Sequence, residues 1–414
     1  MSSPRGTLVL MTDDVRMRGF ARRQTVDQAL AWLDAHLAPL PAEQVGLAAA
    51  AGRVLAAAVQ SGVDVPGFDR ATMDGYAVVA DSTEGATPYN SLPLDVVGEA
   101  LPGRPFDGSL ARGQAVRIMT GAPIPRGCDA VLPAELASDE VRALAAVSPG
   151  KHVGRRGEDI ARGTMVLPIG RRLRPQDLGV LSSIGVSEVA AIRRPRVRLI
   201  VTGNELLPAG SVPHGSCIAD ANGPMLAALV ERDGGLVDFP GIVRDETEPL
   251  LAALRAPADL AIVSGGSSVG VEDLAPSLVA RHGELAVHGI AMRPSSPTGL
   301  GRIEGRLVFL LPGNPVSCLC AYDFFAGRAV RALGGLARDW PYPRRRGRLA
   351  RKLSSQIGRL DYARVRLVDG EVEPLAIAGA SVLSSTTRAD GFVVVPADSE
   401  GFAAGADVDV WLYA

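Results

Sequence analysis

The sequence contains very little lysine. Lys151 and Lys352 are the only lysines in 414 residues, and arginine supplies every other basic side chain except histidine. A Walker phosphate-binding loop requires Gly-Lys-Ser/Thr, and Schiff-base catalysis requires a buried lysine. Neither lysine lies in such a context, so both classes of enzyme are excluded.

Cysteine is also scarce. Cys128, Cys217, Cys318 and Cys320 form no CxxC pair and no zinc-ligand spacing. A disulfide framework is not expected in a chain of this size. We therefore predict reduced thiols and a cytoplasmic location, with Cys318 and Cys320 as core or helix-face thiols rather than ligands.

Long hydrophobic runs and a strong charge of one sign are absent as well. No apolar run reaches the roughly 18 residues of a membrane span, and residues 7–11 are too short for the core of a signal peptide. The formal net charge is −2, so the overall charge favours neither a nucleic acid nor an anionic membrane as a partner. We expect neither, and we predict a loose N-terminal arm up to residue 23.

The length of 414 residues favours two to four domains. Near the N-terminus, Thr25 and Gln28 have the spacing of a capping box and predict the start of a helix. A second helix is predicted from Pro175 to Ser183, because proline is favoured at the first helical position. The helices before and after the central part are predicted to belong to one body.

Residues 62–134 lie between those helices and have a different sequence pattern. Short apolar runs separated by Gly, Pro and Asp predict a β-rich domain with many turns. Two of its polar turns contain Asp74 and Thr120. Each turn taken alone is ordinary turn chemistry, so neither establishes a site by itself.

Residues 195–335 alternate strand and helix patterns, which predicts a largely parallel sheet with helices on both faces. Ligands of such sheets bind at the carboxyl ends of the strands. Glu205, Asp245 and Asp273 all follow predicted strand ends. We therefore expect their carboxylates at one edge of the sheet.

Two turns at the same edge are suited to a phosphate or an oxyanion. Residues 264–270 read Ser-Gly-Gly-Ser-Ser-Val-Gly between a buried strand and a helix, where free backbone N–H groups and the helix dipole favour an anion. The second turn is Pro-Gly-Asn-Pro, with Asn314 as N-cap and Pro315 at the first helical position. Three acids and two such turns predict a metal and a phosphorylated or oxyanionic ligand.

The C-terminal part is predicted to be a separate β domain. Residues 339–348 combine Trp-Pro-Tyr-Pro with a run of arginines and are interpreted as a linker whose charges are solvated. Residues 349–414 alternate short strands with Asp-Gly and Ala-Gly turns, which favours a small barrel or sandwich.

Six motifs together resemble one family. They occur in the order seen in molybdopterin molybdenumtransferases, the molybdenum insertases that include the E domain of gephyrin. The motifs are residues 73–78 (MDGYAV), 117–123 (RIMTGAP), 156–160 (RGEDI), 202–206 (TGNEL), 264–270 (SGGSSVG) and 311–317 (LPGNPVS). The resemblance runs from about residue 24 to residue 414.

The resemblance implies a multi-domain fold of α/β and β type. We expect a discontinuous, elongated helical domain (residues 24–61 plus 150–192), an inserted β-rich domain (62–149), a molybdopterin-binding three-layer α/β domain (193–337) and a C-terminal β-barrel (345–414). It also implies a homodimer, with the active cleft between the α/β domain of one subunit and the inserted β domain of the other.

The family reaction places molybdenum from molybdate on the dithiolene of adenylylated molybdopterin and releases AMP with a divalent cation present. By position, the resemblance implies catalytic roles for Asp74, Thr120, Asp159, Glu205, Asp245 and Asp273, of which the last three are expected to hold Mg²⁺. The cofactor-binding residues it implies are Ser264, Gly265, Gly266, Ser268, Gly270, Arg293, Pro312, Gly313, Asn314 and Pro315.

One segment departs from the family pattern. Where the family has a segment resembling Lys-x-x-x-Lys-Pro-Gly-Lys-Pro, this chain has Gly289, Arg293 and Ser296 at the three lysine positions. Arg293 keeps a charge, but the other two do not. Charge-assisted hydrogen bonds contribute roughly 1.5–3 kcal/mol each, so the loss of two weakens anion binding by about two to four orders of magnitude.

Two functions therefore stay open at the level of the sequence. The retained acids, Thr120 and the glycine turns favour a working insertase, with altered anion handling or a preference for tungstate. The replacements at Gly289 and Ser296 favour a diverged paralogue that binds a pterin, a nucleotide or a partner without inserting metal. An unrelated nucleotide-dependent α/β enzyme accounts for the glycine turn but not for the ordered motifs.

Overall fold

The computed structural model describes residues 23–266, 274–376, 379 and 381–413. The chain divides into two compact units. Unit 1 consists of Met1–Glu43 and Ile192–Ala414, and unit 2 is Gln44–Ala191. The four domain boundaries predicted from the sequence remain predictions. None of the described helices is long and apolar enough to cross a membrane.

A seven-stranded mixed sheet forms the centre of unit 1. Its order is β16-β13-β18-β22-β21-β19, and β17 also pairs with β13. The pairs of β13 with β16, β17 and β18 and of β18 with β22 are parallel, whereas β21 and β19 run antiparallel. The strands are β13 (Arg196–Thr202), β16 (Leu236–Asp238), β17 (Ile242–Val243), β18 (Leu260–Ser264), β19 (Gly283–His288), β21 (Gly299–Ile303) and β22 (Arg306–Leu311).

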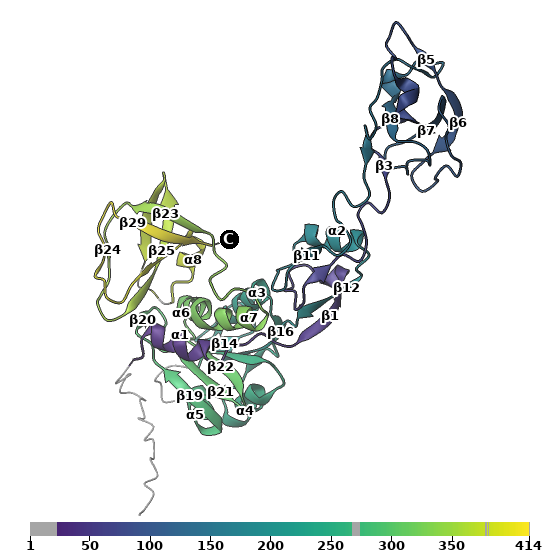
Figure 1. Ribbon diagram of the computed structural model, residues 1–414. Coiled ribbons are helices and arrows are strands. Elements are labelled where there is room, and N and C mark those ends of the chain that lie inside the picture. The colour runs from purple at the N-terminus through teal and green to yellow at the C-terminus, as the bar shows by residue number, and fades with distance from the viewer. Residues whose placement is uncertain (1–22, 267–273, 377–378, 380, 414) are drawn as a thin grey trace, which may run out of the picture. The chain divides into compact units, whose positions relative to one another are not determined.

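Helices cover both faces of this sheet, which gives three layers (Figure 1). Side chains alternate along each strand, so Val197 and Leu199 of β13 enter the core on one face and Ile200 enters the core on the other. The first core includes residues of α1 (Val26–Asp34), α3 (Asn222–Arg232), α6 (Pro315–Ala321), the π-helical turn η4 (Tyr322–Ala326) and α7 (Gly327–Leu333); the second includes α4 (Thr247–Arg255) and α5 (Leu274–His282). The predicted three-layer α/β fold is confirmed.

The C-terminal part is a closed five-stranded barrel, as predicted. It closes because β25 pairs with β26 on one side and with β27 on the other. The barrel strands are β23 (Arg344–Leu349), β25 (Leu360–Val368), β26 (Glu371–Ala376), β27 (Gly391–Val395) and β29 (Asp407–Leu412). Short β20 (Met292–Arg293) extends it from the α/β part, and β24 (Leu353–Ser354), β28 (Gly401–Phe402) and α8 (Ser384–Thr387) complete it.

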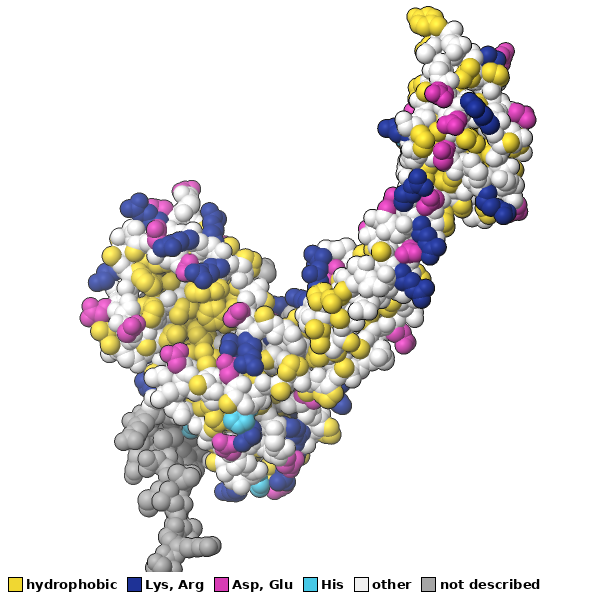
Figure 2. Space-filling model, viewed as in Figure 1, with side chains coloured by type: hydrophobic (Ala, Val, Ile, Leu, Met, Phe, Trp, Pro, Cys, Tyr) yellow, Lys and Arg dark blue, Asp and Glu magenta, His cyan; other side chains and the backbone are white. Residues whose placement is uncertain are grey.

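The interpretation of residues 339–348 as a linker is wrong for residues 344–348. Residues Arg344–Leu349 form β23, which pairs antiparallel with β29 along its length. Apolar and polar residues do not alternate along this strand, because its arginines are exposed on the barrel surface. The sequence pattern therefore did not indicate a strand. The arginines are balanced by acids of the neighbouring strand, such as Asp409 beside Arg344, and Figure 2 shows basic and acidic side chains interspersed over the barrel.

The two aromatic residues of that segment join the barrel to the α/β part. Trp340 and Tyr342 pack edge-on against Phe392 of β27. Beneath them Asp323 is fully buried and accepts a hydrogen bond of 2.9 Å from the Tyr342 hydroxyl. Burial raises the pKa of the Asp323 carboxyl to about 6, although Arg232 and the Tyr342 hydroxyl act in the opposite direction.

Unit 2 contains a four-stranded sheet, several two-stranded sheets and one α-helix among the described residues. The sheet has the order β6-β7-β4-β8, with β6 (Asp95–Ala100), β7 (Gln114–Ile118), β4 (Gly75–Val78) and β8 (Ala130–Pro133). Strand pairs elsewhere are β1 (Ala42–Gly46) with β12 (Glu188–Ile192), β2 (Val59–Gln60) with β11 (Met165–Leu167), β3 (Arg70–Ala71) with β10 (Val153–Gly154), and β5 (Leu92–Pro93) with β9 (Arg142–Ala143). Helix α2 (Pro175–Ser183) begins at the predicted proline, and short turns η1 (Leu47–Ala49), η2 (Ala80–Thr83) and η3 (Ala134–Leu136) complete the unit.

Candidate active site

A pocket of about 700 Å³ lies at the carboxyl edge of the parallel strands in unit 1. The register places Val201 of β13 beside Ser264 of β18, and Ser264 beside Leu311 of β22. The three turns that follow these strands therefore meet at one place, as the sequence predicted. Residues that line the pocket include Thr202, Gly203, Glu205, Asp220, Asn222, Asp245, Ser264, Gly265, Gly266, Pro312, Gly313, Asn314, Pro315 and Ser381.

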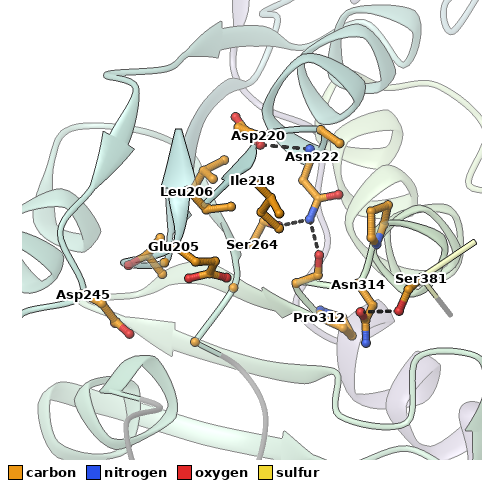
Figure 3. A pocket seen from close by; sticks show the side chains of 18 of the residues that line it. Glu205, Leu206, Ile218, Asp220, Asn222, Asp245, Ser264, Pro312, Asn314 and Ser381 are labelled. Atoms are coloured by element: carbon orange, nitrogen blue, oxygen red, sulfur yellow. Dashed lines mark hydrogen bonds between the residues drawn. The ribbon is translucent and has the colours of Figure 1, made fainter. Parts of the chain in front are cut away.

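Two of the predicted acids stand in the pocket wall. Figure 3 shows Glu205 and Asp245 at the left of the pocket, opposite Asn314 and Ser381 at the right, with Asp220 at the top between them. A Cβ atom on Gly203 would lie only 2.7 Å from the Glu205 carboxylate. The absence of a side chain at Gly203 therefore allows the carboxylate to occupy this position. A Cβ atom on Gly266 would lie 3.6 Å from Asp245 Oδ1. The acid after β17 therefore lies next to the glycine turn after β18.

The glycine turn is tightly packed where the structure describes it. Ser264 is buried, and Gly265 and Gly266 have φ angles of +96° and +57°. A Cβ atom on Gly265 would lie 2.0 Å from the backbone oxygen of Thr202. Glycine is required at Gly265, because an L side chain has neither the backbone conformation nor the space. Ser268, Gly270 and Asp273, which the sequence assigned to the same site, lie outside the described residues.

The side chain of Asn222 connects this turn to the next one. Its Nδ2 donates to Ser264 Oγ at 2.9 Å and to the backbone oxygen of Gly313 at 2.7 Å. Asn222 was not among the site residues expected from the sequence. Its partners are 42 and 91 residues away, so no local pattern could reveal them.

The Pro-Gly-Asn-Pro turn begins α6 as predicted, with Asn314 at the N-cap and Pro315 at the first position. The Asn314 side chain makes no hydrogen bond to the helix. Instead its Oδ1 accepts a hydrogen bond of 2.8 Å from Ser381 Oγ, in the C-terminal part (Figure 3). Ser381 was missed in the sequence, since only the closed barrel brings it to the pocket.

The ionisable side chains that line the pocket are acidic. Glu205, Asp220 and Asp245 are present, and no lysine or arginine occurs among the described lining residues. Within the described residues, no three His, Cys, Asp or Glu side chains are grouped closely enough to hold a metal alone. Mg²⁺ usually uses one or two carboxylates together with substrate phosphates, so Glu205 and Asp245 suit it as a donor set.

The three positions at which the family lysines are replaced lie outside this wall. Arg293 donates to the buried carboxylate of Asp361 at 2.6 Å. Gly289 has a φ of +94° and donates its N–H to the backbone oxygen of Thr298. Gly289, Arg293 and Ser296 do not line the pocket, although the neighbouring Pro297 does.

The remaining predicted residues belong to unit 2. Asp74 Oδ1 accepts hydrogen bonds of 2.7 Å from the Thr120 hydroxyl and of 2.7 Å from the Thr120 N–H. These bonds, from the hydroxyl first and the N–H second, lower the pKa of the Asp74 carboxyl because they favour its charged form. The two predicted turns are thus brought together, with an exposed carboxylate and hydroxyl at their junction.

Asp159 is also exposed in unit 2. Its N–H donates to Val65 O at 3.1 Å, which ties two antiparallel segments together. Ion pairs hold the same segments on either side: Arg156 with Asp64 and Arg155 with Asp69, each at 2.7 Å. Asp159 therefore has a fixed backbone and a side chain exposed to solvent.

The buried thiols have no place in the pocket wall. Cys318 and Cys320 are fully buried on α6. Burial raises the pKa of the Cys318 thiol to about 12, so it is not a thiolate at neutral pH. Their prediction as core thiols agrees with this burial.

A sheet edge with glycine turns, carboxylates and neutral hydroxyl and amide groups is typical of α/β enzymes that bind small molecules at the carboxyl ends of their strands. Three family models match the chain: "MoeA N-terminal region (domain I and II)" at residues 24–185, "Probable molybdopterin binding domain" at 198–332 and "MoeA C-terminal region (domain IV)" at 346–413. The chain belongs to the MoeA family, and it is a transferase of molybdenum cofactor biosynthesis.

Individual relatives agree with this assignment. Molybdopterin molybdenumtransferase 2 of Mycobacterium tuberculosis (strain ATCC 25618 / H37Rv) is 37% identical over 89% of this chain and 94% of its own. Molybdopterin molybdenumtransferase of Haemophilus influenzae is 32% identical over 93% of this chain and 98% of its own. The crystal structure of the molybdopterin biosynthesis MoeA protein from Pyrococcus horikosii matches with a TM-score of 0.80 and 33% identity, over 94% of this chain and 99% of that one.

Proposed function

We propose that this enzyme inserts molybdenum from molybdate into adenylylated molybdopterin, with release of AMP and dependence on Mg²⁺. The observation that carries the proposal is the pocket at the carboxyl edge of the sheet, where acids line the wall without a basic residue among the described lining side chains. Such a wall repels a bare phosphate or oxyanion. It suits a phosphorylated ligand that arrives with a divalent cation.

Each group in the wall has a role in this reaction. Gly265 and Gly266 carry no side chain, so a ligand phosphate can approach the backbone closely. The Asn314 Oδ1 is engaged by Ser381, which leaves the Asn314 amide nitrogen to donate to an oxyanion. Glu205 and Asp245 would hold Mg²⁺, which stabilises negative charge on the phosphate that leaves with AMP.

We further propose that Asp74, Thr120 and Asp159 act in the same reaction through a homodimer. Their side chains belong to unit 2, whereas the pocket belongs to unit 1. The two hydrogen bonds from Thr120 hold Asp74 in one orientation before any substrate arrives. The resemblance to the family supports a shared cleft, in which these residues complete the pocket of the partner subunit.

A second function is favoured by a specific observation. Arg293, which stands at a lysine position of the family, is paired with Asp361, and Gly289 and Ser296 carry no charge. A diverged paralogue that binds a pterin or a nucleotide without metal insertion would show this pattern. The two functions therefore differ in whether the site binds and uses the oxyanion.

The test supplies the purified protein with adenylylated molybdopterin and Mg²⁺, together with molybdate or tungstate, and measures AMP release. We expect release that stops when EDTA is added. Asp245→Asn should lower turnover by about two orders of magnitude, because an ionic metal ligand is replaced by a neutral one. Tight pterin binding without AMP release with either oxyanion would establish the second function instead.

A matched control distinguishes the effect of removing any carboxylate charge from the sheet from the effect of removing a carboxylate that lines the pocket. Asp238 ends β16 in the same sheet, pairs with Arg198 and does not line the pocket. Asp238→Asn should leave AMP release unchanged, since a partly exposed ion pair contributes about 1 kcal/mol or less. Equal losses in both variants would contradict the metal role of Asp245.

A further inference from the structure

Three segments that are distant in the sequence meet on the side chain of Asn222. The residue itself begins α3, Ser264 ends β18, and Gly313 belongs to the turn after β22. Both hydrogens of the Asn222 amide are donated, one to Ser264 Oγ and one to Gly313 O. Because Gly313 O can only accept, these partners fix which end of the amide is the nitrogen.

The chain holds this amide in place with a second set of contacts. Asp220 is 5% exposed, and its Oδ1 accepts from the N–H groups of Asn222 at 2.9 Å and Gly223 at 2.8 Å. A Cβ atom on Gly223 would lie 2.2 Å from the Asp220 carboxylate, so glycine makes room for it. Asn222 is itself only 7% exposed. Its backbone and its side chain are therefore both fixed.

The two turns that Asn222 connects are close together. A Cβ atom on Gly313 would lie 3.6 Å from Gly265 Cα. A hydrogen bond of 3.3 Å from the Gly265 N–H to Leu311 O also joins the two loops. Without the amide, the Gly313 oxygen would lose its donor from α3 and the Ser264 hydroxyl would lose its donor as well. Beyond the strand pair that ends at Ser264 and Leu311, the turns would then be joined by the long backbone hydrogen bond from Gly265.

We propose that Asn222 is a positioning residue of the pocket. It holds the turn after β18 at a fixed distance from the turn after β22, so that both present their backbone to the same ligand. The identity of that ligand rests on the proposed function, whereas the positioning role rests on the contacts alone. The Asn222 side chain is not assigned a contact with the substrate or a part in the chemistry.

Cys318 provides a reporter for this role. Its Sγ lies 3.7 Å from Ser264 Oγ, directly behind the glycine turn. Cys320 lies on the same helix, is equally buried, and has Ser295 rather than Ser264 as its hydroxyl neighbour. A loosened glycine turn exposes Cys318 selectively, whereas a general loosening of α6 exposes both thiols.

The experiment measures alkylation of each cysteine by iodoacetamide, resolved by peptide mass spectrometry, in the full-length protein. In Asn222→Ala we expect Cys318 to react about ten to a hundred times faster than in the wild type, because a buried acceptor loses its donor. Cys320 should keep its rate. Asn222→Asp, which keeps the shape but removes the N–H donors, should have the same effect, and thermal unfolding checks that both variants remain folded.

A parallel arm measures the binding of AMP with Mg²⁺ by calorimetry. We expect weaker binding by a similar factor in both variants. Unchanged Cys318 labelling, or an equal rise at both cysteines, would overturn the positioning role. If the wild type neither binds AMP nor releases it, the proposed function fails while the labelling contrast still decides the role of Asn222.

Discussion

The substitution Gly265→Ala tests the packing of the glycine turn directly. Gly265 has a φ of +96°, a conformation that L residues rarely adopt, and its new Cβ would lie 2.0 Å from Thr202 O. Such a backbone conformation costs about 1–3 kcal/mol for a residue other than glycine. The clash with a backbone oxygen must also be relieved, and overpacking of this kind costs about 1–3 kcal/mol more.

Gly305→Ala is the matched control. Gly305 has a φ of +80° in the hairpin between β21 and β22 of the same sheet, and nothing lies within 4 Å of its added Cβ. In Gly305→Ala the free energy of unfolding should therefore fall only by the contribution of the backbone conformation, about 1–2 kcal/mol. The expected difference between the two variants is the contribution of the clash.

The assay compares thermal unfolding and AMP release for both variants and the wild type. Each kcal/mol lowers the melting temperature of a unit of this size by about 2–4 °C, so Gly265→Ala should melt several degrees below Gly305→Ala. AMP release should be lost in the first and retained in the second, because only the first turn lines the pocket. Equal melting temperatures with equal activity would refute the packing argument.

Two further predictions concern the barrel junction and the dimer. Because the pKa of Asp323 is raised from 3.8 to about 6, the folded state binds more protons than the unfolded state between these values. The stability of the wild type relative to Asp323→Asn should therefore fall by about 2 kcal/mol as pH rises from 4 to 7 in urea unfolding, and a pH-independent difference would contradict the shift. If the cleft is shared between subunits, Asp74→Asn and Asp245→Asn coexpressed in equal amounts should recover about a quarter of wild-type AMP release, since half of the dimers carry one intact site; no recovery would contradict a shared cleft.

The sheet edge could be predicted because its pattern is local. Buried apolar strands alternated with helices, so parallel pairing followed, and with it the meeting of Glu205, Asp245 and the glycine turn at one edge. Each of these residues directly follows its own strand. Their position depends on the strand that precedes them, and the sequence shows that strand.

Asn222 and Ser381 could not be found in this way. Asn222 reaches Ser264 and Gly313 from the start of a helix, and Ser381 reaches Asn314 from the C-terminal part. Their neighbours in the sequence carry no sign of these contacts, because the contacts are created by packing between separate elements. The linker interpretation failed for a related reason, since exposed arginines on β23 hide the alternation that marks a strand.

Arg293 keeps a positive charge at one of the replaced lysine positions, where it is paired with Asp361 outside the pocket lining. Asp361 is fully buried and accepts hydrogen bonds from Arg293 at 2.6 Å and from Ser355 at 2.7 Å, with Arg359 at 3.3 Å. If Arg293 turned away toward an anion, Asp361 would keep one charged partner and one hydroxyl. The cost of that movement is therefore smaller than the 3–5 kcal/mol typical of breaking a buried pair that has no other partner. The ion pair with Asp361 therefore does not by itself exclude anion binding by Arg293.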